Sequence, residues 1–200
     1  GSGEFDIDTN GVVSVATSTV VSPTGTLNLT GGELTTGSMT VESGGIFNFS
    51  SGTLNVTNQN VAVSTSGPLG NSVTIGGNKA LIVDQELSVA LGGSLTLNGG
   101  SVTAGDLTID SGGSFNFDDG TLTIDGGTIT NFRVDSSGDA NIRGEPSTAG
   151  ATATLNLENG ATQGFDNFVF VGRQADGFLN VRSGSTVQVG ADLLIAQTSG

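Results

Sequence analysis

The sequence predicts an all-β fold, a right-handed parallel β-solenoid (β-helix) of about nine coils with three short strands each. The first observation behind this prediction is an internal repeat, because residues 93–124 repeat residues 25–56 after a shift of 68 positions. The apolar positions coincide: Leu27 aligns with Leu95, and Phe47 aligns with Phe115. A repeat this short cannot bury its apolar side chains alone, so it must stack on neighbouring copies.

The alternation of apolar and polar residues and the placement of glycines are the second and third observations. Apolar residues come in pairs separated by one polar residue, which is the side-chain period of a β-strand. Many of the 34 glycines stand between these pairs, where a chain that turns sharply needs positive φ angles. Right-handed coiling follows from the rule for parallel crossover connections. A β-sandwich is the alternative fold, but its strands do not repeat nearly in register at about 20 residues.

Residues 6–131 form the regular part of the predicted solenoid, and the preceding residues 1–5, GSGEF, are interpreted as a cloning scar. Each coil contributes two or three apolar pairs that point inward, and Phe5 already aligns with the first of them. The inward positions of the first six coils are Phe5/Ile7, Val13/Val15 and Thr19/Val21; Leu27/Leu29, Leu34 and Met39/Val41; Phe47/Phe49, Leu54/Val56 and Val61/Val63; Val73/Ile75, Leu81/Val83 and Leu87/Val89; Leu95/Leu97, Val102 and Leu107/Ile109; Phe115/Phe117, Leu122/Ile124 and Ile129.

The pattern loosens after residue 131. Residues 132–154 predict an irregular seventh coil with a loop, and residues 155–200 predict two further coils in one continuous domain, which we expect to be a fragment of a longer protein. The inward positions of these three coils are Phe132/Val134, Ala140/Ile142 and Ala151/Ala153; Leu155/Leu157, Phe165 and Val169/Val171; Leu179/Val181, Val187/Val189 and Leu193/Ile195.

Composition limits the classes of partner. The formal net charge is −14, so the surface repels phosphate, and neither nucleic acid nor anionic lipid is an expected partner. No apolar run approaches 18 residues, so no direct membrane insertion of this stretch is expected. Cysteine and histidine are absent, which removes the thiol nucleophile and the commonest general base and metal ligand.

The segment Asp6-Ile7-Asp8-Thr9-Asn10-Gly11 matches the first six positions of an EF-hand calcium loop. One interpretation is therefore a calcium site at Asp6, Asp8 and Asn10, and calcium is the only cofactor that the sequence suggests. The twelfth position of the loop is Thr17 instead of the usual bidentate glutamate. The other interpretation is that the two carboxylates face water on a strand whose turn is Asn10-Gly11.

Acidic residues at 118 and 119 suggest a second alternative, a polysaccharide lyase or hydrolase, because carboxylate pairs act as acid and base in glycoside cleavage. Such a site also needs a basic partner, and no Lys or Arg occurs between Ala80 and Phe132. We therefore predict that the protein is not an enzyme and that these carboxylates keep an all-β protein soluble.

Outward residues of the first strands form a predicted polar stripe. Its candidate ligand-binding members are Asn28, Asn48, Thr96 and Asn116, and Asn156 and Asn180 are placed on the same stripe. Such a ladder could offer hydrogen bonds to a glycan or order water, as ice-binding solenoids do. The alternative is that Asn and Thr merely suit strand exteriors.

Residues 177–200 resemble the autotransporter-associated and PEP-CTERM-associated repeats of large secreted bacterial proteins, and residues 155–176 share the pattern. The match is carried by Gly177, Leu179, Val181, Gly184, Val187, Val189, Gly190, Leu193 and Ile195. The resemblance implies an extracellular or cell-surface stalk and transfers no catalytic residues.

The resulting functional prediction is a structural or adhesive β-solenoid that mediates cell-surface attachment or self-association. Its expected partners are other copies of itself, end to end or in a surface layer, and a glycan or a host or cell surface. A ligand-binding solenoid for calcium, glycan or ice is the alternative, followed by the polysaccharide lyase or hydrolase.

Overall fold

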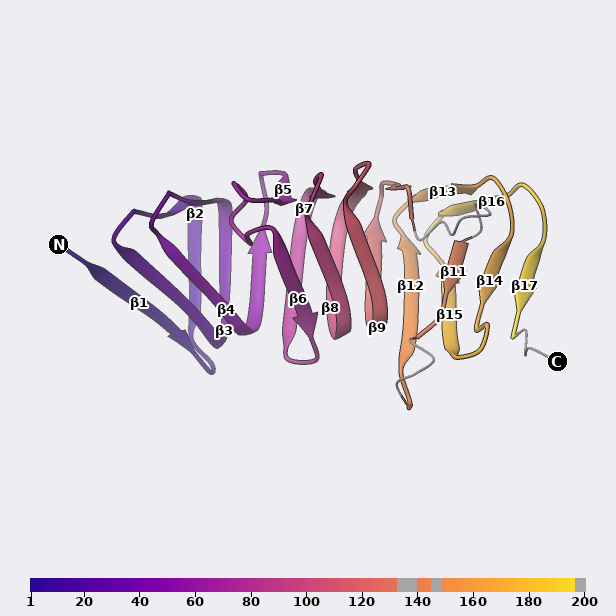
Figure 1. Cartoon of the computed structure of the whole chain (residues 1–200), viewed down its shortest axis with the longest axis horizontal. Helices are drawn as coiled ribbons and strands as arrows, with labels where there is room; N and C mark the ends of the chain where they lie inside the picture. Colours follow the sequence, from indigo (N-terminus) through magenta and orange to yellow (C-terminus); the bar gives the residue numbers. More distant parts are fainter. Residues whose placement is uncertain (133–139, 145–148, 197–200) are drawn as a thin grey trace.

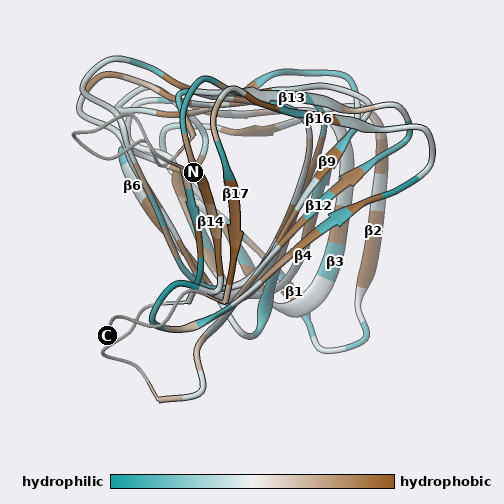
Figure 2. Ribbon diagram, turned by 90° about the vertical axis from the view of Figure 1, so that its right-hand side faces the viewer, coloured by the Kyte–Doolittle hydropathy of each residue, from teal (hydrophilic) through white to brown (hydrophobic). Residues whose placement is uncertain are grey.

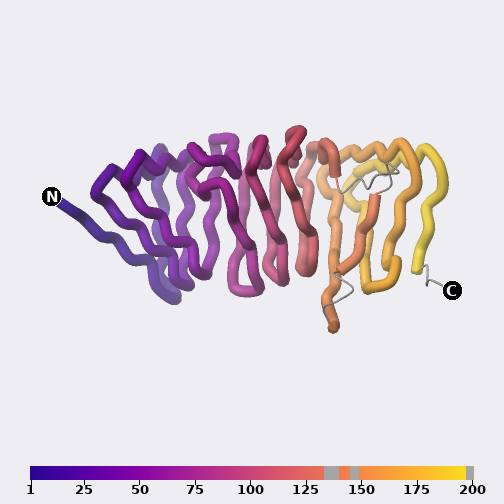
Figure 3. Tube along the Cα trace, viewed as in Figure 1, coloured from indigo at the N-terminus to yellow at the C-terminus, as the bar shows by residue number. Residues whose placement is uncertain are grey.

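A computed structural model of the chain describes residues 1–132, 140–144 and 149–196. Every regular element in these residues is a β-strand, and neighbouring strands pair in parallel. The strands stack along one axis into a rod with the N-terminus at one end and the C-terminus at the other (Figure 1). The trace winds around this axis from end to end (Figure 3). The predicted all-β parallel solenoid is thus confirmed.

The cross-section of the rod is a triangle, with β14 and β17 on one side, β12 on the second, and β13 and β16 on the third (Figure 2). We call these sides face A, face B and face C, in the order in which each coil follows them. Six long strands continue from one face to the next: β2 (Val12–Val21), β3 (Gly25–Val41), β4 (Ile46–Val56), β7 (Lys79–Val89), β8 (Ser94–Ile109) and β9 (Ser114–Asp125).

The remaining strands belong to single faces. Face A contains β1 (Gly3–Asp8), β6 (Ser72–Gly76), β11 (Ala140–Ile142), β14 (Val169–Val171) and β17 (Leu193–Ile195). Face B contains β12 (Thr152–Glu158) and β15 (Asp176–Val181). Face C contains β5 (Val61–Val63), β10 (Ile129–Thr130), β13 (Thr162–Phe165) and β16 (Thr186–Val189).

The predicted register holds throughout the first six coils. On face A, Leu27 pairs with Phe5 on one side and with Phe47 on the other. Further along the same face, Leu95 pairs with Phe115. Leu27, Leu95 and Phe115 are buried and Phe47 is half-buried, and full burial of one such side chain contributes roughly 1.5–3 kcal/mol. The stacked pairs therefore form one continuous core along the rod.

The residues interpreted as a cloning scar include strand residues. Gly3, Glu4 and Phe5 begin β1, and Phe5 lies in register with Leu27. The Phe5 side chain is nevertheless 54% exposed, because β1 has a neighbouring strand on only one side.

The predicted frame, meaning the assignment of each strand to a face within its coil, is wrong after residue 131. Leu155 pairs with Leu122 and Leu157 with Ile124, so β12 lies on face B and is not the first strand of a new coil. Ala153 belongs to the same strand, which crosses the predicted boundary between residues 154 and 155. β11 on face A and β12 on face B belong to one coil, and the length of sequence between these two strands made spacing alone suggest an additional coil. The rod accordingly has about eight turns, followed by β17 as one more face A strand.

The inward positions of the C-terminal coils are otherwise preserved within this shifted frame. Ala140 and Ile142 pair with Val169 and Val171 on face A. Val171 pairs in turn with Ile195, which is 71% exposed because β17 is the outermost strand of its sheet. The predicted inward residue Val134 lies outside the described residues, as do residues 133, 135–139 and 145–148 of the predicted irregular coil.

Candidate functional site

An amide ladder crosses the first three coils on face A. The Asn48 Nδ2 group donates a hydrogen bond to Asn28 Oδ1 (2.7 Å). Asn28 Nδ2 donates in turn to Asp6 Oδ1 (2.6 Å) and to Glu4 Oε1 (2.8 Å). Two of the predicted ligand-binding asparagines are thus in contact, and the carboxylates of Glu4 and Asp6 on β1 orient the Asn28 amide.

The other two predicted ligand-binding residues form a separate pair. Asn116 Nδ2 donates a long hydrogen bond to Thr96 Oγ1 (3.5 Å), and Thr74 pairs with Thr96 on the neighbouring strand. No strand pairing joins the face A part of β4 to β6 among the described residues, so the two pairs are not one unbroken ladder.

Asn156 and Asn180, predicted on the same stripe, lie on face B instead. Asn156 pairs with Thr123, and Asn180 pairs with Asn156 and donates to its Oδ1 atom (2.8 Å). This part of the stripe prediction is wrong for the same reason as the frame after residue 131. Ligand binding by Asn28, Asn48, Thr96 and Asn116 stays a prediction.

The predicted calcium ligands Asp6 and Asp8 lie on β1, and Asn10 occupies the following turn with a φ angle of 66°. Side chains two residues apart on a strand lie about 6.6 Å apart on the same face, whereas an EF-hand wraps its ligands around one point. Asp8 Oδ1 accepts a hydrogen bond from Thr30 Oγ1 (2.7 Å). Within the described residues there is no group of three or more His, Cys, Asp or Glu residues suited to a metal ion. Calcium binding stays a prediction.

Several other carboxylates complete backbone hydrogen bonding at the corners of the rod. Asp119 Oδ1 accepts from the backbone N–H groups of Gly120 (2.8 Å) and Thr152 (2.9 Å). Asp106 Oδ1 accepts from the backbone N–H of Thr128 (2.8 Å). These contacts give the acidic corners a structural role, because they satisfy backbone N–H groups that the hydrogen bonding between strands leaves unpaired.

Lys79 is the only basic residue in the first 132 positions. Its ammonium group donates to Thr74 O (3.0 Å) and lies 5.4 Å from the centre of the Phe49 ring. Desolvation by burial lowers the pKa of Lys79 below its usual value of 10.5. Burial of the charged ammonium group therefore lowers the stability of the fold. This loss of stability is fully present at pH values below the lowered pKa and disappears as the pH rises towards 10.5.

Face C is interrupted between coils six and seven. β10 belongs to the large sheet, whereas β13 and β16 form a separate two-stranded sheet. The buried side chain of Gln163 bridges the interruption: its Oε1 atom accepts from Ile129 N (2.7 Å), and its Nε2 group donates to Ile129 O (3.1 Å). One carboxamide therefore takes the place of a missing strand pairing.

Replacing Gln163 with leucine is expected to lower the free energy of unfolding by about 1–3 kcal/mol. The variant leaves the N–H and C=O groups of Ile129 without these partners, and a buried unsatisfied backbone group costs an amount of this order. Urea denaturation followed by circular dichroism would measure the change. Gln188→Leu is the matched control, because Gln188 is exposed on the neighbouring strand and its loss should change stability by less than about 0.5 kcal/mol. Equal stability of the two variants would contradict this role of Gln163.

The sequence contained a signal for Gln163 that the prediction overlooked. The alternation through residues 161–165 makes Ala161, Gln163 and Phe165 inward, and all three are buried. A glutamine at an inward position must find hydrogen-bond partners, which indicates a local defect in the ladder.

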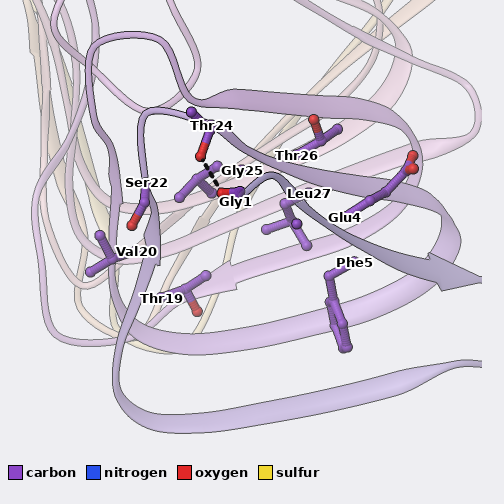
Figure 4. A pocket seen from close by; sticks show the side chains of 12 residues that line it. Gly1, Glu4, Phe5, Thr19, Val20, Ser22, Thr24, Gly25, Thr26 and Leu27 are labelled. Carbon is purple, nitrogen blue, oxygen red and sulfur yellow. Dashed lines mark hydrogen bonds between the residues drawn. The ribbon is translucent and has the colours of Figure 1, made fainter.

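The outer edge of the first coil forms a shallow hollow of about 450 Å³ (Figure 4). β1, the end of β2 and the start of β3 line it, and the exposed side chains of Phe5 and Val20 contribute its apolar part. Thr24 Oγ1 donates to Gly1 O (2.8 Å) across its rim. The hollow lies at the N-terminal end of the stacked coils. Side chains in line with the core, such as Phe5, are only partly covered there.

Within the described residues no helix is long and apolar enough to cross a membrane. Comparison with known proteins returns no match: no family model, no curated protein and no solved structure matches the chain.

Proposed function

We propose that the chain is a structural rod in an exported protein of the bacterial cell surface, where it serves spacing, attachment or self-association. The observation that carries this proposal is the unbroken sheet on face B. There, parts of β2, β3, β4, β7, β8, β9, β12 and β15 pair in sequence along the rod. Eight coils at about 4.8 Å each extend about 38 Å.

Rigidity of the rod follows from its packing. Each coil is hydrogen-bonded to the next on face B, and its inward side chains contact those of both neighbours, so bending would break backbone pairings and uncover the core. The resemblance of residues 155–200 to surface-protein repeats supports the cell-surface location, and the strongly acidic composition is compatible with it. The proposal assigns no catalytic step to the chain.

End-to-end association is the proposed mode of self-association. Side chains in line with the core are exposed at both ends, among them Phe5 (54%) at one end and Ile195 (71%) at the other. Strand edges with unpaired backbone groups readily add another strand. We expect the sedimentation coefficient of the protein to rise with concentration. Ile195→Lys should suppress this rise, because a charge at the junction would be desolvated.

Leu91→Lys is the matched control for this experiment, since Leu91 is 79% exposed in a turn between β7 and β8. It adds the same charge away from both ends and should associate like the unaltered protein. A constant sedimentation coefficient at every concentration would contradict end-to-end association.

Cell-surface location requires a separate test. Antibodies against the folded rod are expected to label intact cells of the source bacterium, and external protease should remove the signal. Labelling that appears only after lysis would contradict the proposed location.

A further inference from the structure

The interruption of face C leaves a groove between coils six and seven. Its volume is about 440 Å³, and its walls come from the residues at β10 on one side and from β13 and β16 on the other. A second hollow of about 230 Å³ adjoins it and shares Ile129, Gln163 and Gly164. The first volume alone falls in the range of about 300–1,000 Å³ that is typical of small-ligand clefts.

Gln163 sets the width of this groove. Where face C strands pair through their backbones, as between β13 and β16, neighbouring strands lie about 4.8 Å apart. At the groove, a carboxamide stands between Ile129 and β13, and a direct backbone hydrogen bond across the break runs from Thr162 N to Gly127 O of the preceding coil (3.0 Å). The opening is therefore built into the folded chain by a hydrogen-bonded side chain.

The groove presents hydroxyl and amide groups and no charged side chain. Its polar lining consists of Thr128, Thr162, Thr186 and Gln188, with Gln163 at the base. Thr162 and Thr186 lie opposite each other on paired strands, as do Gly164 and Gln188. The side chains of Thr162, Thr186 and Gln188 make no hydrogen bond to other described residues, so their donors and acceptors are available to a ligand.

Gly164 gives a ligand close access to the backbone. It is exposed, and a Cβ atom added there would meet nothing within 4 Å. The adjoining hollow continues the groove with the polar residues Asn131, Asp166 and Asn167. A ligand that fills both hollows is therefore longer than one compact ring.

We propose that this groove binds an uncharged oligosaccharide. Sugar hydroxyls both donate and accept hydrogen bonds, as do the threonine hydroxyls and the carboxamide of Gln188. The methyl groups of the threonines supply the apolar contact that sugar rings need on their C–H faces. An anionic polysaccharide is disfavoured, because the chain carries a net charge of −14 and no cationic side chain lines the groove. This site lies on a different face from Asn28, Asn48, Thr96 and Asn116, and it does not depend on where the rod is located.

Calorimetric titration of the whole chain tests the proposal. The probes are neutral hexasaccharides of glucose, xylose and mannose, with a hexasaccharide of a uronic acid as the charged comparison. At least one neutral probe is expected to bind, and more tightly than the uronate. Gly164→Leu, which fills the groove, should weaken that binding at least about tenfold. Thr186→Val, which removes one hydroxyl, should weaken it about threefold to tenfold.

Gly76→Leu is the matched control for filling the groove. Gly76 is a strand glycine on face A whose added Cβ would meet only Asn98 O, at 3.7 Å, so the same substitution adds bulk far from the groove. Its binding should equal that of the unaltered chain, and circular dichroism should show all three variants folded. The proposal is overturned if no neutral probe binds at millimolar concentration, if the uronate binds more tightly, or if Gly164→Leu binds like Gly76→Leu.

Discussion

Replacing Phe117 with alanine is expected to lower the free energy of unfolding by about 3–5 kcal/mol. The Phe117 side chain is fully buried on face A, stacked on Leu97 of the preceding coil and 6.0 Å from the Phe115 ring. Removal of a buried phenyl group costs its transfer free energy and leaves a cavity. The cavity cannot collapse easily, because the hydrogen-bonded ladder between β8 and β9 holds the two coils at a fixed spacing.

Urea denaturation would measure the total loss, and hydrogen exchange would locate it. Because each coil contacts only its neighbours, exchange should accelerate most in β8 and β9 and much less in β1 and β2. Phe178→Ala is the matched control: Phe178 is 54% exposed on β15, and its loss should cost less than about 0.5 kcal/mol. A similar cost for both variants would mean that the Phe117 stack does not carry the stability assigned to it.

The N-terminal two thirds of the fold could be predicted because two independent signals agree there. The 68-residue repeat fixes equivalent positions such as Leu29 and Leu97, and the strand period fixes which of their neighbours point inward. Both residues are fully buried and pair with Phe49 and Phe117. Agreement between repeat and period leaves no freedom to shift the frame.

After residue 131 only the strand period remains, and it does not distinguish one face from another. Leu155/Leu157 has the same spacing as a face A pair, but the structure pairs it with Leu122/Ile124 on face B. An insertion between two faces and an additional coil lengthen the sequence in the same way. The position of Asn156 was predicted wrongly for the same reason.

A second side chain that replaces a backbone pairing, Gln59, carries no signal in the sequence of the kind that marks Gln163. Gln59 Oε1 accepts a hydrogen bond from Met39 N (2.8 Å), much as Gln163 bridges to Ile129. Gln59 lies between β4 and β5, where no alternation of apolar and polar residues shows which way it points, and its role depends on a gap that only the stacked coils create. The polar asparagines Asn28 and Asn48 were placed together correctly because their strands lie within the regular repeat.

Glycines at the corner between faces A and B follow the repeat as closely as the core does. Gly52 and Gly120 are 68 positions apart, with φ angles of 97° and 99°. A Cβ atom at either position would lie 2.2–2.3 Å from a backbone oxygen of the preceding coil, Gly32 O or Gly100 O. These corners therefore need glycine both for the backbone conformation and for the close approach of two coils.

Gly120→Ala is expected to lower the free energy of unfolding by about 2–5 kcal/mol, as the sum of two effects. The positive φ angle costs an L-residue roughly 1–2 kcal/mol. The contact with Gly100 O must be relieved by moving the backbone of two paired strands, which adds roughly 1–3 kcal/mol. Urea denaturation would measure the sum, and Gly52→Ala should give a similar value because its geometry is nearly the same.

Gly160→Ala separates the two effects. Gly160 has a φ angle of 87°, but an added Cβ atom would meet nothing within 4 Å. This variant therefore bears only the conformational cost, and the difference between Gly120→Ala and Gly160→Ala isolates the cost of forcing two coils apart. A difference of zero would mean that the coils separate without loss. Since the rod gains its rigidity from tight stacking, that result would also remove the physical basis for a stiff spacer.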